Sequence, residues 1–263
     1  MLEAARLSLH HLTALDASPL ELIGIAGRVG CAHVTLFTDV PEQARHIYPK
    51  VESADIAAIR EALARANVSV CNLEIFPLDR DGEVNRFADG LQVGAAIGAS
   101  RATVHLHDIV DEAQAMERFA IFAAAAAEHG IVAGLEFNGF SAVRDIESAA
   151  RIVRGAQCGS LVLDALHLMR NGADVTAVAR HADLITYAQF CDGPLDIDVS
   201  LAWHEAVRER AVPGQRAFPL AAILAALDQA VIIEAEVPQT AERKAGVSPE
   251  LRARRAVAGI RAL

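Results

Sequence analysis

The sequence has few of the features that mark disulfide-linked, membrane-spanning or nucleic-acid-binding proteins. Its four cysteines form no CxxC pair, so a disulfide framework or a structural zinc site is not expected. No apolar run reaches the roughly 18 residues of a transmembrane helix. Acidic residues outnumber basic ones, 34 to 24, giving a net charge of −10. We therefore expect a cytoplasmic protein that acts on a small-molecule substrate, with no nucleic-acid partner and no membrane partner.

Apolar residues, in contrast, are abundant and regularly arranged. They make up 53% of the 263 residues, which excludes a disordered chain. Short β-branched or apolar segments alternate with Ala-rich segments that have helical spacing. The pattern predicts eight strands, at 6–10, 32–37, 68–75, 102–106, 132–137, 161–164, 184–190 and 231–236. It predicts eight helices between them, at 19–28, 53–66, 84–97, 112–129, 142–154, 175–180, 219–229 and 249–262.

This alternation predicts an α/β fold, a single (β/α)8 TIM barrel domain over residues 1–263. Each unit has roughly 33 residues, the size of one strand and one helix. Several strands are apolar throughout, as in parallel sheets that helices cover. An open doubly wound sheet is the main alternative, but it usually has a Gly-rich phosphate loop after its first strand, and residues 11–16 contain none. The long segment 192–218 is a candidate active-site loop.

Polar side chains stand at the ends of four consecutive predicted strands. Glu136, Asp164, Gln189 and Glu236 hold these positions, where the active sites of barrels are found. Buried carboxylates that share one mouth repel one another, and a divalent cation would offset that repulsion. Oxygen ligands of this kind suit one hard ion, Mn²⁺, Mg²⁺ or Co²⁺.

The last of these strands offers two candidates for the ligand. Glu234 and Glu236 are two residues apart and point to the same face of the strand. Glu236 lies nearer the carboxyl end, so we choose it as the ligand. Glu234 is expected one layer deeper in the barrel, held by hydrogen bonds.

Several segments together resemble the xylose isomerase-like TIM barrels, the sugar-phosphate isomerase/epimerase superfamily. They are Leu-Glu-Phe at 135–137, Leu-Asp-Ala-Leu-His at 163–167, Ala-Gln-Phe-Cys-Asp-Gly-Pro at 188–194, Arg-Ala-Val-Pro-Gly at 210–214 and Glu-Val-Pro at 236–238. The resemblance implies a single divalent metal held by Glu136, Asp164, Gln189 and Glu236. It is also compatible with a homo-oligomer, a dimer or tetramer. Where such proteins often have Pro-Gly-x-Gly, this chain has Gln215 and Arg216 after Gly214.

Other residues complete the predicted site. Glu136 and Glu236 are candidate catalytic bases, and His167, just beyond a strand end, is a candidate general acid. His105, His107 and His10 follow or end strands and are candidate substrate contacts. Arg210 is a candidate guanidinium clamp for a carboxylate or another anionic oxygen of the substrate. The resemblance places a substrate-binding arginine at this position.

The predicted function is that of a metal-dependent isomerase or epimerase. It would act on a small hydroxy-carbonyl compound, a sugar or sugar acid, by removing a proton next to the carbonyl to give a metal-stabilised enediolate. One alternative is a lyase, a metal-dependent dehydratase of a cyclic keto acid such as a dehydroshikimate. Another is a barrel that binds a ligand without catalysis. A DNA-repair endonuclease is disfavoured by the charge of −10.

Overall fold

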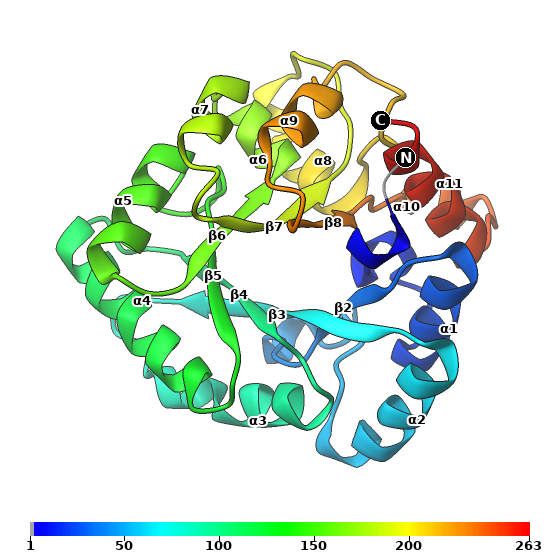
Figure 1. Ribbon diagram of the computed structural model, residues 1–263, viewed down its shortest axis with the longest axis horizontal. Helices are drawn as coiled ribbons and strands as arrows, with labels where there is room; N and C mark the ends of the chain where they lie inside the picture. Colours follow the sequence, from blue (N-terminus) through cyan, green and yellow to red (C-terminus); the bar gives the residue numbers. More distant parts are fainter. Residues whose placement is uncertain (1–2) are drawn as a thin grey trace.

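The computed structural model describes residues 3–263 and contains a closed barrel of eight parallel strands inside a ring of helices (Figure 1). The strands follow one another in chain order around the barrel. They are β1 (Leu7–His10), β2 (His33–Phe37), β3 (Ser69–Leu78), β4 (Arg101–Leu106), β5 (Val132–Glu136), β6 (Ser160–Asp164), β7 (Ile185–Phe190) and β8 (Ile232–Ala235). Leu9 pairs with Ala235, which closes β8 onto β1. The predicted (β/α)8 barrel is confirmed, and the open sheet is excluded.

The helices lie outside the barrel or on its loops. They are α1 (Pro19–Val29), α2 (Ile56–Ala66), α3 (Ala88–Ala96), α4 (Glu112–Ala127), α5 (Ile146–Ala156), α6 (Ala165–Arg170), α7 (Val175–Arg180), α8 (Ala202–Arg208), α9 (Leu220–Ala226), α10 (Thr240–Lys244) and α11 (Pro249–Arg261). Capping side chains explain where two of the helices, α1 and α5, begin. Ser18 and Glu21 form a capping box before Pro19, and the side chain of Asp145 accepts a hydrogen bond from the Ser148 amide.

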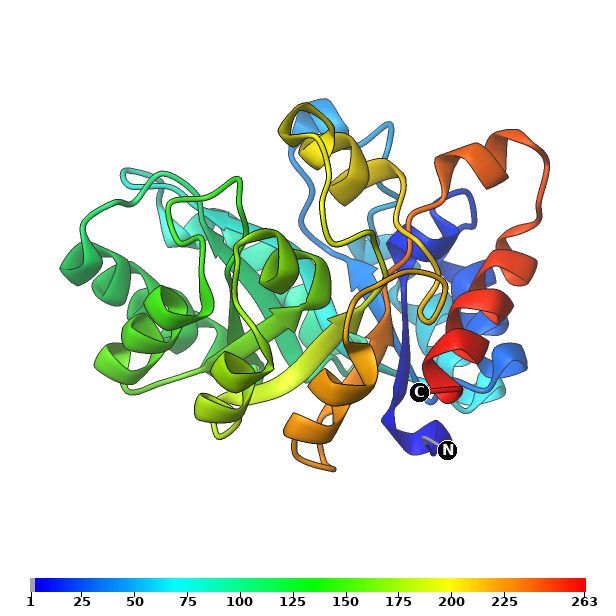
Figure 2. The ribbon, with the colours of Figure 1, turned by 90° about the horizontal axis from the view of Figure 1, so that it is seen from above.

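Most of the predicted helices differ from the structure in extent, and α6, α8 and α10 were not predicted. The helix predicted at 142–154 begins at Ile146, because Asp145 caps it. The segment 192–218 is not irregular throughout, because it contains the 3-10 helix η6 (Val199–Leu201) and α8. In Figure 2, α8 (yellow) and α10 (orange-red) rise at the end of the barrel where the strand arrows point. The loop after β7 therefore stands over the end of the barrel where the predicted site residues lie.

Two apolar layers hold the barrel together. Outside, strand residues pack against helices, and Phe76 of β3 contacts Phe87 and Phe122 at ring-centroid distances of 5.4 Å each. All three rings are buried. Inside, Cys71, Val162 and Tyr187 form a smaller cluster. All four cysteines are free, and no helix among residues 3–263 is long and apolar enough to cross a membrane.

The phenylalanine cluster supports a test of stability. Phe122→Ala should lower the free energy of unfolding by about 3–5 kcal/mol, because it removes a fully buried ring between α4 and β3. Ile121→Ala is the matched control, since Ile121 lies next to it with its side chain exposed, and it should cost about 0.5 kcal/mol or less. Urea denaturation followed by circular dichroism measures both. Equal losses for the two variants would contradict this account of the core.

Candidate metal centre

Two acids and a histidine meet at the carboxyl ends of β5 and β6. Glu136 is the last residue of β5 and Asp164 the last of β6, while His167 lies in the first turn of α6. Each offers one ligand atom, and the three atoms lie within 4.8 Å of one another. Asp164 also caps α6, because its Oδ1 accepts a hydrogen bond from the Leu166 amide at 2.6 Å. This cap fixes the carboxylate, and its Oδ2 lies 3.7 Å from His167.

Arg210 joins this cluster to Glu236, which directly follows β8. Its guanidinium lies 2.8 Å from Asp164 Oδ2 and 3.1 Å from Glu236 Oε1, and all three side chains are buried. Burial raises the pKa of Glu236 well above its ordinary value, and nearby Asp164 and Glu74 add to the rise, although Arg210 and His10 oppose it. The Oε2 atom of Glu236 is buried and has no hydrogen-bond partner among residues 3–263.

The loop after β7 positions Arg210. Arg170 of α6 forms a two-bond ion pair with Glu205 of α8, with both N–O distances at 2.6 Å. The neighbouring carbonyl of Ala206 accepts a hydrogen bond from Nε of Arg210 at 2.9 Å. The Arg170–Glu205 pair therefore holds the helix that supports the guanidinium.

Gln189 is bound to an acid that we did not predict as part of the site. The Nε2 atom of Gln189 donates to Oε1 of Glu74 on β3 at 3.0 Å. Glu74 Oε2 lies 2.9 Å from Nε2 of His10, and Asn72 donates to Glu74 Oε1 at 3.4 Å. The Oε1 atom of Gln189 is buried and has no partner in the described part of the chain.

Glu74 and His10 influence each other's protonation state. Burial alone would raise the pKa of Glu74, but the charge and hydrogen bond of His10 hold it below its ordinary value. Burial would lower the pKa of His10, yet Glu74, Glu236 and Glu234 raise it to about 10. Full protonation would require a hydrogen on Nδ1, which already accepts from the Leu12 amide. We favour the neutral form for that reason, and in both forms Nε2, which lies 2.9 Å from Glu74 Oε2, carries a hydrogen.

The remaining predicted histidines occupy different environments. Nε2 of His105 lies 2.6 Å from Oε2 of Glu136. Burial would lower the pKa of His105, but the charge and hydrogen bond of Glu136 raise it. Burial lowers the pKa of His167, although Asp164 and Glu136 oppose this, which favours a neutral ring at neutral pH. His107 lies just past β4 and is exposed, and its place as a substrate contact stays a prediction.

The two candidate acids of strand eight have different surroundings. Glu234 lies in the barrel interior and accepts hydrogen bonds from Ser8 at 2.6 Å, Thr35 at 2.7 Å and Tyr187. Three hydroxyl donors satisfy this carboxylate without a cation. Glu236 instead meets Arg210 and keeps one free oxygen. This contrast supports Glu236 as the ligand and Glu234 as the deeper, hydrogen-bonded residue.

The residues at the mouth fit a divalent cation. Buried oxygen acceptors without a donor are costly, and both Gln189 Oε1 and Glu236 Oε2 are in that state. Together with Glu136 and Asp164 they supply the oxygen donors that such an ion takes. The close cluster also offers His167 nitrogen as a further ligand atom.

A family comparison agrees with this fold. The model of the xylose isomerase-like TIM barrel family matches residues 23–263. The chain belongs to the xylose isomerase-like TIM barrel family. No curated protein matches this chain in a comparison of sequences.

Solved structures of this family share the fold at low sequence identity. The IolI protein, whose crystal structure contains a zinc atom, is 18% identical with a TM-score of 0.79, and 98% of each chain is covered. A xylose isomerase domain protein from Salmonella typhimurium LT2 is 15% identical with a TM-score of 0.81, over 100% of this chain and 98% of that one. The 3-keto-D-glucoside 4-epimerase YcjR from E. coli is 12% identical with a TM-score of 0.73, over 98% of this chain and 100% of that one.

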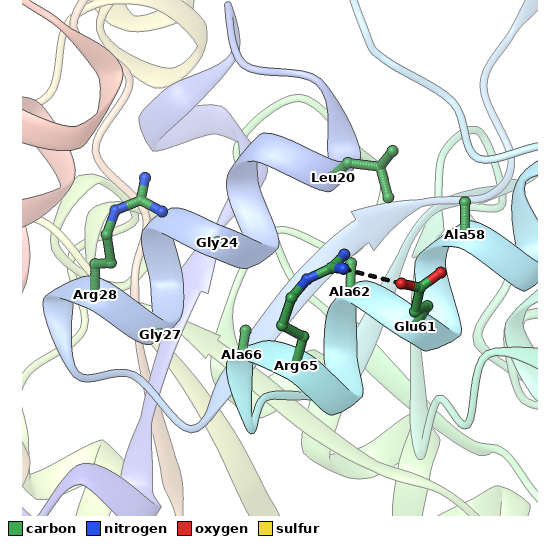
Figure 3. A pocket seen from close by; sticks show the side chains of 9 residues that line it. All are labelled: Leu20, Gly24, Gly27, Arg28, Ala58, Glu61, Ala62, Arg65 and Ala66. Carbon is green, nitrogen blue, oxygen red and sulfur yellow. Dashed lines mark hydrogen bonds and ion pairs between the residues drawn. The ribbon is translucent and has the colours of Figure 1, made fainter.

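A groove of about 480 Å³ on the outside of the barrel is not part of this centre. Figure 3 shows it between α1 and α2, where Gly24 and Gly27 face small residues of α2, and Arg65 pairs with Glu61. A Cβ atom on Gly27 would come within 2.9 Å of the Ala66 carbonyl oxygen. The glycine therefore allows close helix packing, and none of the predicted site residues lines the groove.

The proton positions predict how metal binding depends on pH. A divalent ion that takes Glu136 and Glu236 would lower the raised pKa values of His105 and Glu236, so both would release protons. Mn²⁺ affinity should therefore rise between about pH 6 and 8, by up to about tenfold per pH unit for each proton released. Isothermal titration in buffers of different ionisation enthalpy counts these protons.

A variant of His105 tests whether this residue is one source of the protons released when Mn²⁺ binds. His105→Gln should reduce the number of protons released by up to about one, because it removes the imidazole bound to Glu136. Glu242→Gln on α10, an exposed residue, should match the original protein. Metal affinity that is independent of pH, with no proton released, would rule out this linkage.

Proposed function

We propose that this barrel is a divalent-metal-dependent isomerase or epimerase of a small hydroxy-carbonyl compound, a sugar or sugar acid. One observation carries the proposal: two acids and a histidine converge at the barrel mouth, beside two buried oxygens that lack donors. Among structures of similar fold are a 3-keto-D-glucoside 4-epimerase, a D-allulose 3-epimerase and an L-ribulose 3-epimerase. We expect the protein to act in the cytoplasm on a small molecule, without nucleic acid or membrane, and a homo-oligomer is compatible with this function.

The proposed reaction begins with removal of a proton next to a carbonyl. When bound, the divalent ion supplies stabilisation of the negative charge that develops on the substrate oxygens. Glu236 is our first choice as the base, because burial raises its pKa and its Oε2 has no partner among residues 3–263, and it would act as the base while it also holds the ion. Glu136 is less available, because its Oε2 is bound to His105. His167, held neutral by burial, is suited to donate a hydrogen bond to a substrate oxygen.

Arg210 has limited capacity for a substrate carboxylate. Three of its five N–H groups already bind Asp164, Glu236 and the Ala206 carbonyl. A fixed bidentate clamp on an acid, which the sequence suggested, would need both remaining N–H groups, although Nη1 also donates to Cys191 Sγ at 3.9 Å. We propose instead a single hydrogen bond from Arg210 to a substrate oxygen. The dehydratase of a cyclic keto acid gains no specific support from this geometry and remains the alternative.

Turnover of a panel of substrates tests the proposal. Ketopentoses, ketohexoses and small hydroxy or keto acids are incubated with the protein and Mn²⁺, and the products are identified by NMR and mass spectrometry. We expect an isomer or epimer of unchanged mass. At saturating Mn²⁺, Glu236→Gln should lower kcat by at least about 100-fold, the usual contribution of a general base.

A surface variant serves as the control for this experiment, and specific results would contradict the proposal. Glu242→Gln, on the surface of α10, should leave kcat unchanged. A product that has lost water would favour the dehydratase. Full activity of Glu236→Gln, or equal activity after removal of all divalent ions, would contradict the proposed mechanism.

A further inference from the structure

Glu74 is a buried carboxylate that neither the predicted ligand set nor the proposed catalytic residues include. It lies on β3, across the barrel interior from Gln189 on β7, and is 4% exposed. Both of its oxygens are engaged, Oε1 by the Gln189 amide and Oε2 by His10. Its hydrogen bonds and ion pair within the described residues reach Gln189, Asn72 and His10, and none of Glu136, Asp164 and Glu236. Its contact with the metal centre therefore runs through Gln189.

A glutamine ligand must be oriented correctly to bind a metal, whereas either oxygen of a carboxylate ligand can bind. Its side-chain amide has an oxygen that can bind a cation and an NH2 group that cannot, and the two ends have nearly the same shape. Gln189 must therefore be held with Oε1 toward the metal. In the structure Oε1 is the end without a partner, while Nε2 is fixed by Glu74 at 3.0 Å.

We infer that Glu74 is a positioning residue that selects the orientation of the Gln189 amide and so makes it a metal ligand. This inference rests on the metal centre of the proposed function. An ionised carboxylate only accepts hydrogen bonds, so Glu74 binds the NH2 end of Gln189 and leaves the oxygen for the cation. Partners that orient a ligand in this way commonly change metal affinity by about 10–100-fold.

His10 explains why an amide cannot replace this carboxylate. Nδ1 of His10 accepts from the Leu12 amide, so the hydrogen of the neutral ring is on Nε2, which lies 2.9 Å from Glu74 Oε2. Glu74 thus accepts from Gln189 through Oε1 and has the His10 ring nitrogen 2.9 Å from Oε2. A glutamine at position 74 would offer only one acceptor. If that acceptor stays with His10, its NH2 group faces Gln189 and favours the flipped amide, with the wrong end toward the metal.

The test is a double-mutant cycle read out as Mn²⁺ affinity of the full-length protein, measured by isothermal titration. Glu74→Gln should weaken Mn²⁺ binding by about 10–100-fold. In a Gln189→Met background, which has no amide to orient, the same substitution should change affinity by about twofold or less. A loss that acted only through the charge of Glu74 would be of equal size in both backgrounds. Melting temperatures in EDTA show whether each variant is folded.

The outcomes separate this inference from the proposed function. If the original protein binds no Mn²⁺, the metal centre and the role of Glu74 are both overturned. If it binds Mn²⁺ and Glu74→Gln binds equally well, or loses the same factor in both backgrounds, only the role of Glu74 is overturned. Should Glu74→Gln fail to fold, Glu74→Asp replaces it in the same cycle. It keeps the charge but withdraws the acceptors by one methylene, and the same pattern is expected.

Discussion

The buried ion pairs of Arg210 with Asp164 and Glu236 are the interaction on which the mouth of this barrel depends. Buried carboxylates are costly unless cations or donors meet them, and one guanidinium meets two of them here. Arg210 comes from the loop after β7, where the Arg170–Glu205 pair holds α8 in place. The loop is long enough to bring the guanidinium of Arg210 back to the acidic strand ends.

The barrel interior separates two kinds of acid by depth. In the lower layer, hydroxyl groups satisfy Glu234, and such a carboxylate needs no ion. In the upper layer, Glu236 pairs with Arg210, and its Oε2 has no hydrogen-bond partner among residues 3–263. Glu234 lies on β8 and Glu236 just after it, so their different surroundings come from neighbouring segments: β1, β2 and β7 surround Glu234, and the loop after β7 brings Arg210 to Glu236. A strand that places acids two residues apart can thus use one for structure and offer the other to a ligand.

Sequence periodicity predicted the barrel well, because every βα unit repeats the same burial pattern. It predicted the strand-end acids because their positions follow from chain order. It could not predict that Glu74 meets Gln189, since 115 residues separate them and only barrel closure brings β3 opposite β7. One signal was available: Glu74 is an acid inside an apolar strand. It also could not predict that Arg210 pairs with Asp164 and Glu236, since their approach depends on how α8 folds within a loop.

The neutrality of Gln189 follows from the charge at the mouth. Glu136, Asp164 and Glu236, when ionised, carry −3, and Arg210 carries +1, so the sum is −2. A divalent ion balances that sum, whereas a fourth carboxylate at position 189 would leave an excess of −1 in a buried site. A neutral ligand avoids this excess but can bind through only one of its two ends. The negative charge that Gln189 omits is present instead on Glu74, where His10 lies beside it and its oxygen fixes the amide. The extra carboxylate, Glu74, therefore does not bind the metal itself but orients the neutral ligand Gln189 through a hydrogen bond.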